Sequence, residues 1–144
     1  MCYCTQGEGD NMDRFDNWVP PVIEHGVMTR WCWMVYHPTN LRLGRKTDIG
    51  AFTFINALYG VEIGEGVQIG GGCLIYSIST IGNLTGKVVL EAGCMIGAHS
   101  TIMPGVTVGR GAIVGAHSFV NKDVPAGWLA LGVPAKPVRR IEGK

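Results

Sequence analysis

Residues 96–120 read IGAHSTIMPGVTVGRGAIVGAHSFV. An aliphatic residue recurs at every sixth position from Ile96 to Val120, and the tetrapeptide Gly-Ala-His-Ser occurs twice. The two copies place His99 and His117 eighteen residues apart, which is three periods of six. A fixed short period of this kind is typical of a solenoid, and hexapeptide repeats are a known signature of β-helices.

The same period covers most of the chain. It appears at Leu43, Ile49 and Ile55, then at Ile63, Ile69, Ile75 and Ile81, and then from Leu90 onward. The chain contains 22 glycines, too many for a helical protein, and they commonly follow the aliphatic residue. Three hexapeptides make a triangular coil of eighteen residues with its aliphatic side chains inside, and coils stack about 4.8 Å apart. The sequence therefore predicts an all-β, parallel β-helix in which His99 and His117 lie one above the other at one corner.

Two breaks in the period predict outward loops. Two residues are extra between Ile55 and Ile63, and three are extra between Ile81 and Leu90. We expect a single domain with four parts: a disordered N-terminus at 1–17, an N-terminal cap at 18–40, the β-helix at 41–125 and a C-terminal extension at 126–144. The cap contains three tryptophans, and the extension is predicted to be a tail or a short helix.

Bulk properties exclude several classes of function. The formal net charge of +1 gives no argument for nucleic acid or an anionic membrane as partner. No apolar stretch is long enough for a membrane span, and the first thirty residues lack the order of a signal peptide. We expect a cytoplasmic protein.

The five cysteines form an odd set without framework spacing, which suggests reduced thiols. Cys2 and Cys4 are a weak candidate metal pair in a terminus that we expect to be frayed. Cys73 and Cys94 are predicted to be buried packing residues on one face, one coil apart.

Three stretches resemble the hexapeptide-repeat acyltransferases, the left-handed β-helix family that includes sugar O- and N-acetyltransferases. They are the run of hexads from Leu43 to Val120, the segment IMPGVTVGRGAIVGAHSFVNKDVP, and the closing GVPAKPVRRI. The resemblance covers roughly residues 37–141. It implies a left-handed coil, a homotrimer, and acetyl-CoA bound in the groove between adjacent subunits.

The resemblance also implies which residues bind the donor. The pantetheine arm would run past the backbone at two corners, and the nucleotide end would reach the C-terminal segment. Small corner residues permit that approach, and lysines meet phosphates as point charges. The candidate donor-binding residues are Gly97, Ala98, Ser100, Gly115, Ala116, Ser118, Lys122, Pro134, Ala135 and Lys136.

Acyl transfer to a hydroxyl needs a base within hydrogen-bond reach of the acceptor. Where many sugar O-acetyltransferases of the family have a catalytic histidine, this chain has the segment around Thr80 and a short loop. We therefore predict His99 as the base, with His117 and His37 as weaker candidates, and Thr80 and Asn83 as acceptor-binding residues. N-acetylation of an amino sugar remains open, because a neutral amine attacks a thioester with little assistance.

Two other classes of function stay open. γ-Class carbonic anhydrases share this fold, and His99, His117 and His37 of a neighbouring subunit would be the metal ligands. That family pairs two ligands five residues apart, a spacing that the histidines here do not have. A binding solenoid without chemistry is the other alternative. The preferred interpretation is direct acetyl transfer to a sugar or sugar nucleotide, with no metal expected.

Overall fold

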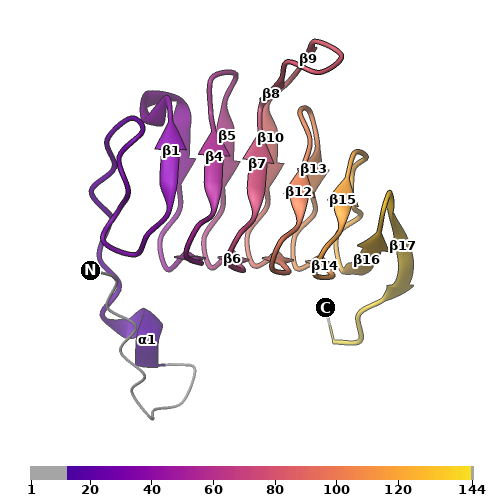
Figure 1. Cartoon of the computed structure of the whole chain (residues 1–144). Coiled ribbons are helices and arrows are strands. Elements are labelled where there is room, and N and C mark those ends of the chain that lie inside the picture. Colours follow the sequence, from indigo (N-terminus) through magenta and orange to yellow (C-terminus); the bar gives the residue numbers. More distant parts are fainter. Residues whose placement is uncertain (1–12, 144) are drawn as a thin grey trace.

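The computed structural model describes residues 13–143 and shows a parallel β-solenoid in which short strands stack along one axis (Figure 1). In this part of the chain, three sheets form the walls. Sheet A contains β1 (Met34–Tyr36), β4 (Phe54–Asn56), β7 (Leu74–Tyr76), β12 (Thr101–Ile102) and β15 (Phe119–Val120). Sheet B contains β2 (Leu41–Leu43), β5 (Val61–Ile63), β10 (Val88–Leu90) and β13 (Thr107–Val108). Sheet C contains β3 (Asp48–Ile49), β6 (Gln68–Ile69), β11 (Met95–Ile96), β14 (Ile113–Val114), β16 (Trp128–Gly132) and the antiparallel β17 (Ala135–Arg140).

The chain visits the sheets in the order A, B, C, so each circuit is one coil with three corners. We call these corners A/B, B/C and C/A after the two sheets that they connect. Strands of successive coils pair in parallel and in register, as with Ile55 opposite Ile75 in sheet A. This register brings residues far apart in sequence into columns along the axis.

The predicted hexad residues build the core. Between Ile49 and Val120, all of the predicted aliphatic positions except Ile81 are buried, and several are fully inaccessible, including Ile55, Ile75, Leu90 and Ile102. Side chains alternate between the two faces of a strand, so every inward aliphatic residue is flanked by outward ones. The narrow interior is filled by one layer of aliphatic side chains per coil.

The longer break in the period is larger than predicted. Ile81 is 86% exposed because it lies in a hairpin between β8 (Ile78–Ser79) and β9 (Leu84–Thr85), which projects from the solenoid (Figure 1). The coil resumes only at β10, where Val88 pairs with Val61. The prediction that Ile81 faces inward is therefore wrong.

Because this break is longer than predicted, the expectation that Cys73 and Cys94 lie on one face, one coil apart, is also wrong. Cys73 lies next to Thr53 of the preceding coil, whose Oγ1 accepts a hydrogen bond from the Cys73 N–H at 3.3 Å. Cys94 instead precedes β11, which pairs with β6. Both cysteines are free and buried as predicted, but they belong to different corners.

Glycines after the aliphatic residues allow the coils to stack closely. A Cβ added to Gly70 would lie 2.6 Å from the backbone nitrogen of Ala98 in the next coil. At Gly97, an added Cβ would clash with the backbone of Ala116. The sequence pattern of an aliphatic residue followed by glycine is thus a requirement of coil-to-coil contact.

Part of the segment expected as an N-terminal cap already belongs to the solenoid, because β1 is a strand of sheet A. Trp33 is buried in the core, and the indole Nε1–H of Trp18 donates to the carbonyl of Thr47 at 2.9 Å. Most of the segment predicted to be disordered lies outside the described residues, including Cys2 and Cys4. Within it, α1 (Asp13–Asp16) is a short helix.

The C-terminal extension forms a hairpin of β16 and β17 where a tail or a short helix was expected. Strand β16 continues sheet C because Leu129 pairs with Ile113 in parallel. The extension is therefore joined to the last coil by backbone hydrogen bonds.

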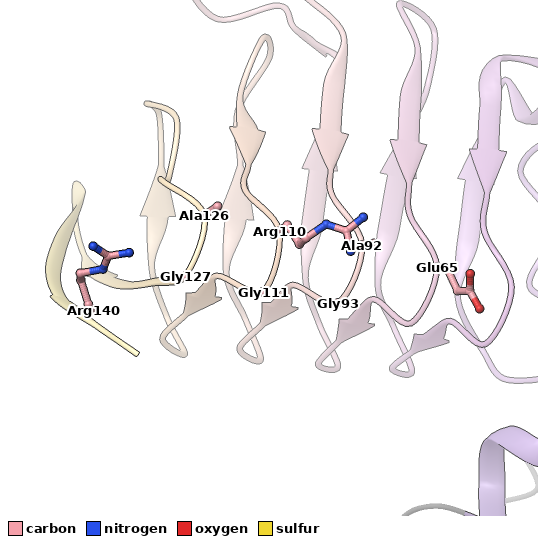
Figure 2. Close-up of a pocket in the computed structure, with 8 residues that line it drawn as sticks. All are labelled: Glu65, Ala92, Gly93, Arg110, Gly111, Ala126, Gly127 and Arg140. Carbon is pink, nitrogen blue, oxygen red and sulfur yellow. The ribbon is translucent and has the colours of Figure 1, made fainter. Parts of the chain in front are cut away.

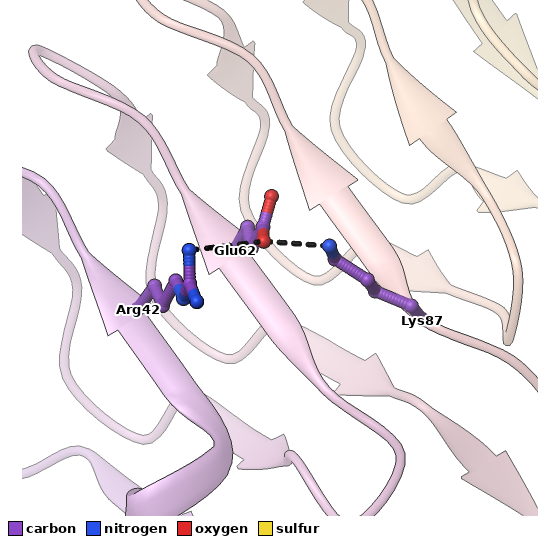
Figure 3. Close-up of polar contacts among 3 residues, drawn as sticks. All are labelled: Arg42, Glu62 and Lys87. Carbon is purple, nitrogen blue, oxygen red and sulfur yellow. Dashed lines mark ion pairs between the residues drawn. The ribbon is translucent and has the colours of Figure 1, made fainter.

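A small cluster of charged residues lies on the outer face of sheet B. Glu62 Oε1 forms an ion pair with Lys87 Nζ at 2.6 Å and lies 4.0 Å from a guanidinium nitrogen of Arg42 (Figure 3). The hydrogen bond from Lys87 lowers the pKa of Glu62 below its usual value, and the charges of Lys87 and Arg42 act in the same direction.

The sequence predicted reduced cysteines and no membrane span. Cys32 is disulfide-bonded, so the prediction of reduced thiols is wrong for this residue. Within residues 13–143 no helix is long and apolar enough to cross a membrane.

Candidate functional site

A column of left-handed residues runs along the C/A corner. Its members take the same place in successive coils and have φ between 58° and 69°: Cys32, Phe52, Gly72, His99 and His117. Backbone bonds join neighbouring coils here, as from the His99 N–H to the Gly71 carbonyl and from the His117 N–H to the Ala98 carbonyl, both at 2.9 Å. Three members of the column have exposed side chains: Phe52, His99 and His117.

His99 and His117 are stacked at this corner, as their eighteen-residue spacing predicted. Their ring centroids are 5.1 Å apart and the rings are 14° from parallel. Both residues are exposed. This confirms the predicted stacking and leaves both imidazoles accessible to a ligand.

The missing side chain of Gly72 gives His99 its position. A Cβ at Gly72 would lie 2.6 Å from His99 Nδ1 and 2.7 Å from Cε1. The imidazole therefore occupies the space above Gly72, with its Nδ1–Cε1 edge toward the glycine and Nε2 away from it.

Small residues surround the two histidines. Gly97 and Ala98 precede Ser100, and Gly115 and Ala116 precede Ser118. The two serine side chains face the interior, where both hydroxyls donate to the Gly115 carbonyl, at 3.0 Å from Ser100 and 2.6 Å from Ser118. A ligand at this corner would therefore meet backbone and alanine, with the serine hydroxyls already committed to the fold.

The turn of the C-terminal hairpin lies beside Gly115 and Ser118, which flank His117 in sequence. The Gly132 N–H donates to Ser118 Oγ at 3.2 Å, and a Cβ at Gly115 would lie 2.9 Å from Leu131 Cβ. The turn that follows contains Pro134, and Ala135 and Lys136 begin β17, so these three predicted residues lie near the corner that bears the histidines.

Other predicted site residues lie at the A/B corner of the same chain. Lys122 follows β15, and Thr80 and Asn83 belong to the β8–β9 hairpin, where the Asn83 N–H donates to the Thr80 carbonyl. His37 begins the 3-10 helix η1 (Pro38–Asn40), and its N–H donates to His25 Nδ1 at 2.9 Å. Within one chain, sheet A separates all of these residues from His99.

A groove that the sequence analysis missed lies at the B/C corner (Figure 2). It has a volume of about 690 Å³ and is lined by Glu65, Ala92, Gly93, Arg110, Gly111, Ala126, Gly127 and Arg140. The lining glycines form a second left-handed column, with φ of 72°, 67° and 74° at Gly93, Gly111 and Gly127. The groove lacks histidine, so its volume alone does not make it the centre of acyl-transfer chemistry. The glycine spacing was a visible signal, but Arg140 arrives there only through the antiparallel return of β17.

Metal-ligand geometry is limited in this chain. Among residues 13–143 no group of three or more His, Cys, Asp and Glu side chains lies close enough to hold a metal ion. Residues 13–143 of a single chain therefore do not form a carbonic-anhydrase-like site by themselves.

Comparison with known proteins supports the hexapeptide-repeat assignment. Residues 87–122 match the family model described as Bacterial transferase hexapeptide (six repeats). Bifunctional protein GlmU of Rubrobacter xylanophilus is 34% identical over 104 residues, which are 72% of this chain and 21% of that protein. The chain spans only 21% to 32% of the length of the first curated relatives that it matches.

Solved structures agree over most of the chain. The hexapeptide-repeat-containing acetyltransferase of Vibrio cholerae O1 biovar eltor, in complex with acetyl-CoA, has a TM-score of 0.73 and 26% identity, covering 83% of this chain and 69% of that chain. The polySia-specific acetyltransferase NeuO has a TM-score of 0.62 and 28% identity, covering 75% and 52%. Rigid superposition preserves hand, so this agreement supports the left-handed coil that the resemblance implied.

Proposed function

Because this chain is a hexapeptide-repeat protein of the bacterial transferase type, we propose that it transfers an acetyl group from acetyl-CoA to a sugar or sugar nucleotide. The observation that carries the proposal is the exposed His99–His117 stack, which lies near Pro134 of the hairpin turn and Ala135 and Lys136 at the start of β17. A base and a phosphate-binding cation then lie along one corner. The likeness to GlmU and to NeuO supports this class of function.

In this proposal acetyl-CoA lies parallel to the solenoid axis along the C/A corner. The phosphates meet Lys136, and the pantetheine arm passes Ala116 and Ala98, whose small side chains permit close approach to the backbone. The thioester then lies near His99. Gly97, Ser100, Gly115 and Ser118 contribute through the backbone that they shape.

His99 acts as the general base. Nε2 takes the proton from an acceptor hydroxyl, and the hydroxyl oxygen attacks the carbonyl carbon of the thioester. The carbon–sulfur bond breaks as the tetrahedral intermediate collapses, and the CoA thiolate takes up the proton from the imidazolium. An amine acceptor would attack in the same geometry and lose its proton to the same nitrogen.

We further propose that the working unit is a homotrimer. Within one chain, Thr80, Asn83 and Lys122 lie at the A/B corner and His99 at the C/A corner, so they cannot meet across sheet A. A neighbouring subunit that presents its A/B corner to this C/A corner would bring them together. We place the reaction in the cytoplasm, because acetyl-CoA is the donor.

Calorimetric titration of the metal-stripped protein with CoA tests the donor site. Stoichiometric binding without metal supports the transferase. Zinc uptake without CoA binding would instead identify the carbonic-anhydrase-like alternative, and CoA binding without turnover on any sugar would identify a binding solenoid.

Substitution of His99 tests the base. His99→Ala should lower kcat for a hydroxyl acceptor by 10²-fold to 10⁴-fold, roughly the contribution of general base catalysis, while CoA binding is retained. His117→Ala is the matched control, because it removes the other ring of the stack. Equal activity of the His99→Ala enzyme would refute this role of His99.

A further inference from the structure

The groove at the B/C corner is built on a column of residues that precede the left-handed residues of that corner. In successive coils this column reads Arg45, Glu65, Ala92, Arg110 and Ala126. Backbone hydrogen bonds fix its register. The Gly93 N–H donates to the Glu65 carbonyl at 2.9 Å, and the Gly111 N–H donates to the carbonyl of the next member, Ala92, at 3.2 Å. Charged and small residues therefore alternate along the floor of the groove.

The C-terminal hairpin adds a second arginine to this floor. Arg140 pairs with Trp128 in the hairpin, and the N–H of the following residue, Ile141, donates to the Gly127 carbonyl at 2.8 Å. The Gly127 N–H donates in turn to the Arg110 carbonyl at 3.0 Å. Arg110 and Arg140 thus stand on one hydrogen-bonded backbone frame, two steps or roughly 10 Å apart along the axis.

Both guanidinium groups extend along the groove. Figure 2 shows the Arg140 side chain reaching toward Ala126 and the Arg110 side chain reaching toward Ala92. Within residues 13–143 neither guanidinium forms an ion pair with a carboxylate. Glu91 lies at the same corner, but its Oε2 accepts the Arg110 N–H at 2.9 Å. The groove therefore presents two permanently charged groups, each in front of an alanine.

The opposite end of the groove limits the length of a ligand. Glu65 lies there, one coil beyond Ala92, and its carboxylate repels any further anionic group (Figure 2). A long polyanion would have to pass this charge. Two cationic positions closed by one anionic position instead match a short ligand with an anionic group at each end.

We propose that this groove binds a small bisphosphate, with one phosphate on Arg140 in front of Ala126 and the other on Arg110 in front of Ala92. A guanidinium binds phosphate through two parallel N–H···O bonds, and a phosphate ester carries a charge of about −1.5 to −2 at neutral pH. The alanines leave room for the phosphate oxygens beside the backbone. Sheet C separates this corner from the corner of His99, so the site is independent of the proposed acetyl transfer.

Calorimetric titration with fructose 1,6-bisphosphate and fructose 6-phosphate tests the site. The two probes share a skeleton and differ in the second phosphate. The wild-type protein should bind the bisphosphate about tenfold tighter or more, because the second phosphate then binds intramolecularly. Arg110→Gln and Arg140→Gln should each weaken bisphosphate binding about tenfold, since each removes a charge-assisted pair, and should abolish the preference over the monophosphate.

Two further variants separate a built site from general attraction to positive charge. Arg45→Gln is the matched control, because Arg45 is an exposed member of the same column that does not line the groove, and it should leave the affinity unchanged. Ala126→Phe fills the floor without a change in charge and should abolish binding. Ala126 is exposed, so this variant should melt near the wild-type temperature.

Three results would overturn the proposal. The first is equal affinity of the wild-type protein for the two probes, or no binding of the bisphosphate. The second is an equal loss of affinity in Arg45→Gln and Arg110→Gln, which would show diffuse attraction. The third is competition between the bisphosphate and CoA, which would place the phosphates at the donor corner.

Discussion

Under the proposed function, Gly72→Ala should slow acetyl transfer by displacing the imidazole of His99. The added methyl carbon would lie 2.6 Å from His99 Nδ1, whereas ordinary contact is about 3.5 Å, so the imidazole must retreat by roughly 0.9 Å. A misplacement of about 1 Å at a catalytic group can reduce the rate about 10²-fold. We expect a fall of that order in kcat for a hydroxyl acceptor.

Gly66→Ala is the matched control. Gly66 has φ of 71° against 69° at Gly72, and a Cβ there would meet nothing within 4 Å. Both variants therefore carry the same left-handed alanine, which costs roughly 1–2 kcal/mol and lowers the melting temperature by about 2–8 °C for a chain of this size. Only Gly72→Ala moves the imidazole.

The assay measures release of the CoA thiol with the best acceptor from a panel of sugars and sugar nucleotides, alongside thermal unfolding of each variant. Equal melting temperatures with unequal kcat values would support the position assigned to His99. If Gly72→Ala and Gly66→Ala were equally active, the base would not be the imidazole above Gly72, and the proposed geometry would be refuted.

Three further predictions concern other parts of the molecule. Lys136→Ala should raise the KM for acetyl-CoA about tenfold in steady-state kinetics and leave kcat unchanged, because the lysine charge contacts phosphate and takes no part in the chemistry. An unchanged KM would show that the nucleotide of CoA binds elsewhere. Cys94 should resist alkylation by iodoacetamide at pH 8 until the protein unfolds, because burial and the nearby charge of Glu91 raise its pKa to about 12. Mass spectrometry measures the alkylation, and rapid labelling of the native protein would contradict this expectation. Lys87→Met should raise the pKa of Glu62, as measured by NMR titration. Since the ion pair lowers that pKa in the folded state, its contribution to stability is present at neutral pH and disappears on acidification. An unchanged titration would show that the pair does not persist in solution.

Most of the fold followed from the period of six because a narrow interior admits only one aliphatic layer per coil. The error at Ile81 has a physical cause. Apolar residues in the β8–β9 hairpin continue the spacing by coincidence, and only the pairing of Val88 with Val61 shows that the coil has not advanced. Sequence periodicity alone does not distinguish a residue inside a coil from one in a projecting loop.

The same limit applies to the candidate site. The stack of His99 on His117 was predictable because the last full coil has the regular length of eighteen residues, from Ile102 to Val120. Earlier coils are longer, with twenty residues from Ile55 to Ile75, so Phe52 was not recognised as a member of the same column. The groove with Arg110 and Arg140 needed the antiparallel return of β17, which no periodic signal announces.

The coil-to-coil register makes the solenoid a ruler graduated in steps of about 4.8 Å. Phe52, His99 and the C-terminal turn lie along one corner of the solenoid, and the number of coils between two of them sets the length of a molecule that spans them. Insertion of a whole coil between Gly72 and His99 would therefore lengthen the distance from Phe52 to His99 by about 4.8 Å and leave each corner intact. Selectivity for ligand length in such a protein can therefore evolve through a change in the number of coils, without a change within any single coil.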